Sequence, residues 1–215
     1  MTHRTGTRYV AVAMLGVATA CAPRARPLEG APVPSALRLP RVELAPTPQR
    51  IVFRWRYEED GFSARGDGVA RIAPPDSARL DFFLDGGFGG GWAILVGDAI
   101  TSPAGDMAQR LIPPAPMLWA ALGRLAVPPG RDTTLRQRGD TLRADVAGSD
   151  RTWRVTLAGP RLVGLEQLVS SRVVERLTRD SARVRYTNVV ARRALSIDVQ
   201  RAEAAAPFPA TIWSR

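Results

Sequence analysis

Residues 50–58 alternate between apolar and mostly polar side chains. Ile51, Phe53, Trp55 and Tyr57 fall on one face of this segment, and the intervening positions are polar or charged apart from one valine. A period of two over this length predicts a β-strand with one face buried.

The same period returns through most of the chain up to residue 201. It predicts further strands at 62–73, 78–84, 91–96, 133–138, 141–146, 151–157, 162–169, 173–178, 182–189 and 192–201. Gly66 and Gly68 predict a bulge or a sharp bend within the first of these. Residues 162–169 also fit one face of a helix, and we expect a strand there because the neighbouring segments are strands.

Residues 117–125 carry the one clear helix pattern, with apolar side chains over a broad face. About eleven strands and one inserted helix predict a mainly β fold, because a flat sheet of that size exposes an apolar face unless it curls. We therefore expect a single strongly curved antiparallel sheet, a half-open β-barrel, with one or two lid or plug helices.

Residues 1–20 have the layout of a secretory signal peptide. Arg4 and Arg8 precede the uncharged, mostly apolar run 9–20, which is short for a membrane span. The run ends at Val17-Ala18-Thr19-Ala20-Cys21, which resembles the lipobox of bacterial lipoproteins. That resemblance implies cleavage before Cys21 and its modification by acyl chains, which together hold a protein firmly to a membrane. A plain signal peptide followed by an incidental cysteine is the alternative.

Residues 21–49 contain seven prolines: Pro23, Pro27, Pro32, Pro34, Pro40, Pro46 and Pro48. This density disfavours helix and sheet and predicts an extended tether, which spans up to roughly 90 Å at full extension. A short packed segment formed by Leu37, Leu39, Val42 and Leu44 is the alternative. The domain organisation expected is a signal peptide at 1–20, a proline-rich tether at 21–49 and a folded domain at 50–215.

Composition removes several kinds of chemistry. All 30 cations are arginine, so lysine-dependent nucleotide binding and Schiff-base catalysis are excluded. Cleavage after residue 20 removes the only histidine, His3, and lowers the formal net charge from +10 to +8. We therefore expect no cofactor, no metal and no enzyme activity, since the acid pairs Asp81/Asp85 and Asp140/Asp145 have nothing in the sequence that places them in a cleft.

Three stretches within residues 50–215 resemble the LolA/LolB family of periplasmic lipoprotein carriers and receptors. They are Trp55 with residues 66–80, the Pro-x-x-Trp-x-x-x-Gly pattern of residues 116–123, and the strand pair at 186–199. The resemblance implies a half-open barrel whose apolar concave face, closed by helical lid segments, binds acyl chains.

The apolar face of such a sheet gives a candidate site for acyl chains, which gain about 25 cal/mol per Å² of apolar area buried. The candidate lining residues are Phe53, Trp55, Tyr57, Phe82, Leu84, Trp92, Ile94, Trp119 and Leu122. An ordinary filled core made by the same residues is the alternative. Phe88, alone among glycines at 86–91, is a candidate membrane-insertion residue, unless it folds back onto the sheet.

The positive charge raises the question of a nucleic-acid partner, and the export signal argues against one. The arginines concerned are Arg172, Arg176, Arg179, Arg183, Arg185, Arg192 and Arg193. They are typical of a solvated sheet face, and attraction to anionic lipid headgroups is the alternative.

The function expected is that of a lipid-anchored, non-enzymatic binder of lipid or lipoprotein acyl chains, at the periplasmic face of the outer membrane. A structural or sensing lipoprotein with a filled core, which docks a periplasmic protein partner, is the second hypothesis.

Overall fold

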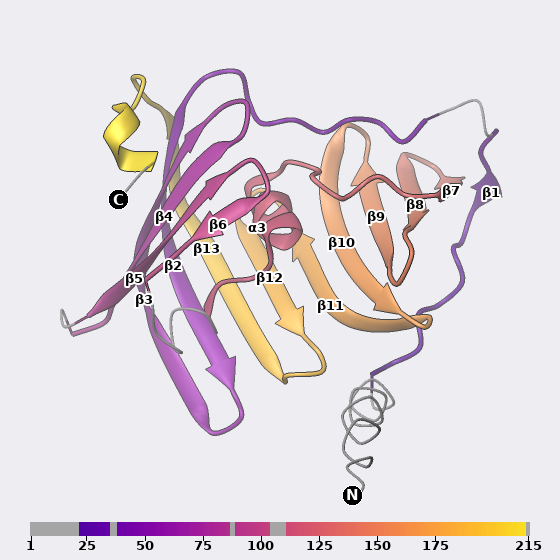
Figure 1. The fold of residues 1–215 in the computed structure, drawn as a ribbon, viewed down its shortest axis with the longest axis horizontal. Helices are drawn as coiled ribbons and strands as arrows, with labels where there is room; N and C mark the ends of the chain where they lie inside the picture. Colours follow the sequence, from indigo (N-terminus) through magenta and orange to yellow (C-terminus); the bar gives the residue numbers. More distant parts are fainter. Residues whose placement is uncertain (1–21, 35–37, 87–88, 104–110, 214–215) are drawn as a thin grey trace, which may run out of the picture.

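The computed structural model describes residues 22–34, 38–86, 89–103 and 111–213. These residues form one antiparallel sheet of 13 strands, which curls around an α-helix (Figure 1). The elements are β1 (Ala31–Pro32), β2 (Gln49–Glu59), β3 (Phe62–Ala73), β4 (Ser77–Leu84), β5 (Gly90–Val96), β6 (Ala99–Thr101), α3 (Ala115–Leu122), β7 (Asp132–Arg138), β8 (Thr141–Ala147), β9 (Thr152–Ala158), β10 (Arg161–Val169), β11 (Arg172–Arg179), β12 (Arg183–Asn188), β13 (Arg193–Ala204) and the 3₁₀-helix η1 (Ala210–Trp213).

The strand order in space is β1-β7-β8-β9-β10-β11-β12-β13-β2-β3-β4-β5-β6, so the sheet starts at β1 and stops at β6. This is the curved, half-open sheet that the sequence predicts. We call strands β2–β6 the aromatic wing and strands β7–β13 the aliphatic wing, after the side chains that each contributes to the core.

Every strand predicted from the period of two is present, including the ambiguous segment at 162–169, which is β10. Two short strands, β1 and β6, were not predicted because neither is long enough to show a period. The helix ends earlier than predicted, since Gly123 adopts the left-handed conformation that caps it (φ 96°).

The predicted bulge at Gly66 and Gly68 is wrong. The pairing of β3 with β2 and β4 runs through both glycines without a shift of register. Their role is to make room, because a Cβ atom at Gly68 would overlap the ring of Phe53 on β2, and one at Gly66 would overlap the backbone of Phe83 on β4.

Helix α3 lies in the hollow of the sheet and connects the two wings. It packs on β10 and β11 of the aliphatic wing, and the indole Nε1 of Trp119 donates to the carbonyl of Gly97 beside β5 (2.7 Å). Four consecutive residues, Met117–Ala120, are buried. A helix buried on every side needs no polar face, which explains why this one has none.

The proline-rich segment lies against the folded domain. Contrary to the expectation of no sheet, it contributes β1, which pairs with β7, and an isolated bridge between Arg24 and Arg172. Arg154 donates to the carbonyl of Arg26 (2.5 Å) on the outer face of the sheet. Leu39, Val42 and Leu44 pack against the core, as the alternative of a short packed segment allows, and Leu37 lies outside the described residues.

The turns of the sheet gather at two ends. Those between β2 and β3, β8 and β9, β10 and β11, and β12 and β13, with the end of β4 and the start of β5, share one end of the strands, which we call the cleft end. The turns between β2 and β3 and between β12 and β13 mark this end at the bottom of Figure 1. The remaining hairpin turns, including that at Gly97, lie at the opposite end, which we call the far end.

Candidate functional site

Seven of the nine candidate lining residues lie on the concave face or on α3. Phe53, Trp55, Tyr57, Phe82 and Trp119 are at most 4% exposed, and Leu84 and Leu122 are half-buried beside them. The rings of Phe53 and Trp55 each meet the ring of Phe82 edge-on, with centroids 5.7 Å apart. The sequence therefore identified one real aromatic cluster.

Trp92 and Ile94 do not join this cluster, and their assignment to the concave face is wrong. Each pairs across the sheet with a residue of the outer face, Trp92 with Asp81 and Ile94 with Arg79. Arg79 also lies over the Trp92 ring and donates to the carbonyl of Ile212 in η1. Ile94 is buried because η1 covers the outer face there, a contact that periodicity within β5 could not reveal.

The centre of the concave face is packed. The aromatic cluster meets the fully buried part of α3, so these residues form core between the sheet and the helix. This arrangement matches the alternative of a filled interior for the middle of the hollow. Space for a ligand has to be sought towards its ends.

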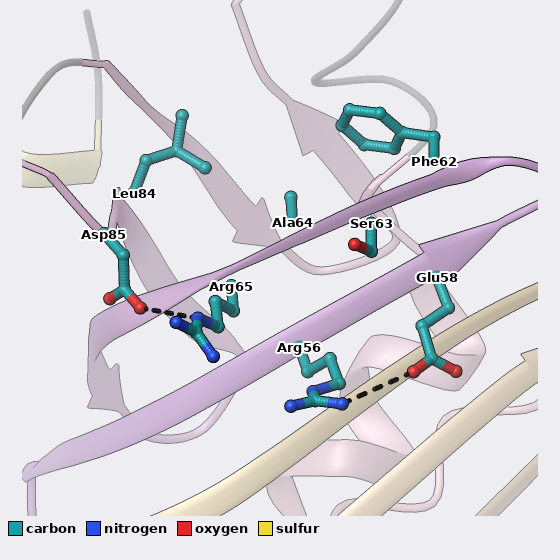
Figure 2. A pocket seen from close by; sticks show the side chains of 8 residues that line it. All are labelled: Arg56, Glu58, Phe62, Ser63, Ala64, Arg65, Leu84 and Asp85. Carbon is teal, nitrogen blue, oxygen red and sulfur yellow. Dashed lines mark ion pairs between the residues drawn. The ribbon is translucent and has the colours of Figure 1, made fainter.

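A cleft of about 520 Å³ opens at the cleft end of the aromatic wing (Figure 2). It forms where β4 ends at Leu84 while β3 continues to Phe62, so that no strand among the described residues pairs with the start of β3 on that side. Its lining residues are Arg56, Glu58, Phe62, Ser63, Ala64, Arg65, Leu84 and Asp85. The volume lies within the range of about 300–1,000 Å³ typical of small-molecule sites.

The cleft has an apolar side and a charged side. Figure 2 shows Phe62, Ala64 and Leu84 on one side of the strand and the two arginines on the other. Arg65 pairs with Asp85 (3.0 Å), and Arg56 lies 3.8 Å from Glu58. The apolar side continues directly into the buried cluster, because Ala64 and Leu84 pack against it and Phe62 contacts the ring of Tyr57.

The aliphatic wing ends differently on the same face. A row of cross-strand neighbours, which we call the polar row, replaces the apolar core there: Trp153, Gln167, Glu175, Asn188 and Arg193, with Glu59 on β2. Sequence reasoning missed it, since Gln167 and Glu175 look like ordinary surface positions of polar strands. The alternation of β10 and β11 places Gln167 and Glu175 at positions where an apolar, inward-facing residue is expected. Their polarity at these positions was the sign of the polar row in the sequence.

Glu175 is the centre of the polar row and is 7% exposed. Its carboxylate accepts from the Tyr186 hydroxyl (2.8 Å) and from the Asn188 amide (3.2 Å). Gln167 bridges it to Arg151, donating to Glu175 Oε2 (3.0 Å) and accepting from the guanidinium (2.9 Å). Burial raises the pKa of Glu175, while the two hydrogen bonds and the Arg151 charge oppose that rise.

Tyr186 stays protonated beside this carboxyl. Burial is the main cause that raises the pKa of its hydroxyl, and the charge of Glu175 acts in the same direction. Most groups of the polar row thus bind one another, in contrast to the open cleft of the other wing. The buried Nε1 of Trp153 is the exception, since it has no hydrogen-bond partner among the described residues.

Two predicted site residues, Cys21 and Phe88, lie outside the described residues. The chain next to Cys21 is described, and it is held at the turn between β10 and β11. Ala22 is 2% exposed, and its carbonyl accepts from Arg172 (2.6 Å). Lipidation of Cys21 and membrane insertion by Phe88 stay predictions.

Most of the predicted arginine surface is neutralised locally. Arg176, Arg183 and Arg192 are exposed and each pairs with a carboxylate, at 2.6 Å, 2.7 Å and 3.5 Å respectively. Arg185 is exposed too, whereas Arg172, Arg179 and Arg193 are half-buried. Desolvation by burial lowers the pKa of Arg179.

Nothing in the described part of the chain assembles catalytic or metal-binding groups. Asp81 pairs with Arg71 and Arg79, Asp85 with Arg65, and Asp145 with Arg154, so three of the four acids considered above are bound by arginine. The fourth, Asp140, accepts from the hydroxyl of Thr141. No cluster of three or more metal-ligating side chains occurs among the described residues. Nor does any helix among them have the length and apolar character needed to cross a bilayer.

The fold is similar to solved structures that share little sequence with it. A LolA superfamily protein from Nitrosomonas europaea superposes with a TM-score of 0.52 at 10% identity, over 80% of this chain and 92% of that one. A putative outer membrane lipoprotein-sorting protein domain from Vibrio parahaemolyticus gives 0.48 at 6% identity, over 80% and 91%. No protein-family model and no curated protein matches the chain. The predicted LolA-like fold is confirmed.

Proposed function

We propose, on the basis of this LolA-like fold, that the protein binds the acyl chains of a lipid or lipoprotein in the cleft at the cleft end. It acts without enzymatic chemistry, anchored through lipidated Cys21 to the periplasmic face of the outer membrane. The observation that carries the proposal is the continuity between the open cleft and the buried aromatic cluster.

The cleft suits an acyl chain better than a polar ligand. Phe62, Ala64 and Leu84 offer an apolar wall, along which a hydrocarbon chain gains about 25 cal/mol per Å² of buried area. The arginines on the other side of the strand, Arg56 and Arg65, provide partners for a carboxylate or phosphate at the polar end of the ligand. Both already have acidic neighbours, so we expect the apolar contact to supply most of the affinity.

The test is a fluorescence titration of the mature protein with a dansyl-labelled fatty acid. We expect saturable binding of one probe per chain, and a loss of affinity of about tenfold or more in Ala64→Phe, because the larger side chain fills the cleft. Ala202→Phe makes the same exchange at an exposed position near the far end and is the matched control. Unsaturable binding, or equal affinity in both variants, would contradict the proposal.

The packed centre of the hollow favours a second candidate. A protein whose interior is already filled by Met117–Ala120 has no need of a lipid ligand, and it would act as a structural or sensing lipoprotein that docks a periplasmic protein partner. Native mass spectrometry separates the two candidates. Acyl-chain binding predicts added masses of lipid on the purified protein, and the second candidate predicts the mass of the processed chain alone.

A further inference from the structure

Large apolar side chains exposed to solvent gather at the cleft end. Four such residues occur in the described part of the chain. Phe62 (40% exposed), Phe83 (53%) and Val190 (38%) lie at or next to the turns of the cleft end, and Val96 (44%) lies at the far end. Clustered exposed apolar groups mark a surface that meets an apolar partner.

The chain enters the domain at this same end. Val173 donates its backbone N–H to the carbonyl of Pro23 (2.9 Å), and Ala25 donates to the carbonyl of Ser171 (2.8 Å). With the bond from Arg172 to Ala22, these contacts hold the chain against the turn between β10 and β11. The point of attachment to residue 21 is therefore fixed at the cleft end and does not hang from a free tether.

The sequence just before this point is the part of the chain suited to a membrane. The apolar run 9–20 ends one residue before Cys21. If the chain is cleaved and Cys21 is lipidated, its acyl chains enter the bilayer. If residues 9–20 are not removed, this apolar segment enters the bilayer instead. Both outcomes place the bilayer beside Ala22. The turn between β12 and β13, which carries Val190, lies at the same end of the sheet as the turn between β10 and β11 that holds Ala22, so one bilayer surface can meet both.

Charges at the cleft end do not oppose such a contact. Arg192 pairs with Asp60 (3.5 Å), Arg151 with Asp150 (2.6 Å) and Arg65 with Asp85 (3.0 Å). Arg24 and Arg172, beside Ala22, form no ion pair with a carboxylate among the described residues, so they attract anionic headgroups at the attachment point. Contact away from this point, where the charges are paired, should depend on the apolar side chains and change little with salt.

We propose that the cleft end lies against the lipid bilayer, with Val190 and Phe62 at the boundary between headgroups and acyl chains, so that the cleft opens towards the membrane. This deepens the proposed function and rests on its membrane attachment at residue 21. A ligand chain would then pass between bilayer and cleft without crossing water.

The test attaches the mature chain to vesicles through its one cysteine. Cys21, with its thiol unmodified, is coupled to a maleimide-headgroup lipid in vesicles of phosphatidylethanolamine and phosphatidylglycerol, and amide hydrogen exchange is compared with that of the uncoupled protein. We expect exchange at residues 60–63 and 189–192 to slow by about fivefold or more, and exchange at residues 97–99 to change by less than about twofold. Equal effects at both ends, or slowing confined to residues 97–99, overturn the proposal.

A pair of matched variants identifies the side chains responsible. Val190→Glu places a charge at the proposed contact, and Val96→Glu places the same charge on a valine of similar exposure at the far end. The first variant is expected to abolish the slowing at residues 60–63 and the second to preserve it, at both low and high salt. Preserved slowing in Val190→Glu contradicts the proposal, as does loss in Val96→Glu or in high salt.

The result of the hydrogen-exchange experiment does not depend on whether the cleft binds an acyl chain. Chemical coupling supplies the attachment whether or not the cell lipidates Cys21, and the titration with the fatty-acid probe needs no vesicle. A failure of orientation is therefore distinguishable from a failure of acyl-chain binding.

Discussion

The aromatic and aliphatic wings share one concave face and one helix, yet they end differently at the cleft end. The aromatic wing stays apolar up to its last residues, where Phe62, Ala64 and Leu84 line an open cleft. The aliphatic wing turns polar, and its polar row is closed by mutual hydrogen bonds around Glu175. The comparison indicates that, on the described part of the concave face, the aromatic wing offers an apolar ligand an open edge, whereas the aliphatic wing presents Glu175 and its hydrogen-bonded partners.

The largest effect is expected from glycine replacement in the aromatic wing. Gly68→Ala should lower the free energy of unfolding by about 3 kcal/mol, because the added methyl group overlaps the buried Phe53 ring and the backbone of Asp81. Gly164→Ala in the aliphatic wing is the matched control, since its nearest neighbour is 3.5 Å from the added atom, and we expect a change within about 1 kcal/mol. Urea unfolding measures both, and equal losses would show that the aromatic wing is no more tightly packed.

A smaller effect is expected where the polar row meets the aromatic wing. Arg193 pairs with Glu59 at 2.7 Å, and the side chains are 29% and 16% exposed. Arg193→Ala should cost about 1 kcal/mol, since it leaves a half-buried carboxylate without this partner. Arg192→Ala, at the exposed neighbouring pair, should change stability by less than about 0.5 kcal/mol. Similar losses in both variants would argue against a structural link between the wings.

The smallest effect concerns the protonation of the polar row. Because burial raises the pKa of Glu175, the folded state holds a proton more tightly than the unfolded state, and its stabilising contribution is lost as pH rises above the ordinary carboxyl value of 4.5. Glu175→Gln keeps an acceptor for Tyr186 and cannot ionise. The unfolding free energy of the variant should therefore fall less than that of the wild type as pH rises from 4 to roughly 8, and parallel curves would contradict a raised pKa.

Much of the fold was predictable because strand periodicity is local. The alternation from Ile51 to Tyr57 identified β2 and its buried face without further information. The same local rule failed for Ile94 and Trp92, because η1 covers the outer face of β5 and makes both faces of that strand partly buried. When a strand face is buried by a segment that is distant in the sequence, the alternation of side chains within the strand cannot predict that burial.

The candidate site was predictable in part for the same reason. Residues that share a face, such as Trp55 and Phe82, were found together, since the pairing of neighbouring hairpins follows from chain order. The cleft depends on β3 continuing past the end of β4, and the polar row depends on the register of six strands, β9–β13 and β2. Neither strand ends nor register could be derived from the apolar pattern.

The central claim is that acyl chains enter the aromatic wing at the cleft. A photoactivatable fatty acid carrying a diazirine, bound to the mature protein and irradiated, tests it directly when the adducts are located by tandem mass spectrometry. We predict adducts on residues 56–65 and 82–85, competed away by excess unlabelled fatty acid. Adducts concentrated on residues 151–188 of the aliphatic wing, or spread over the surface without competition, would contradict the account.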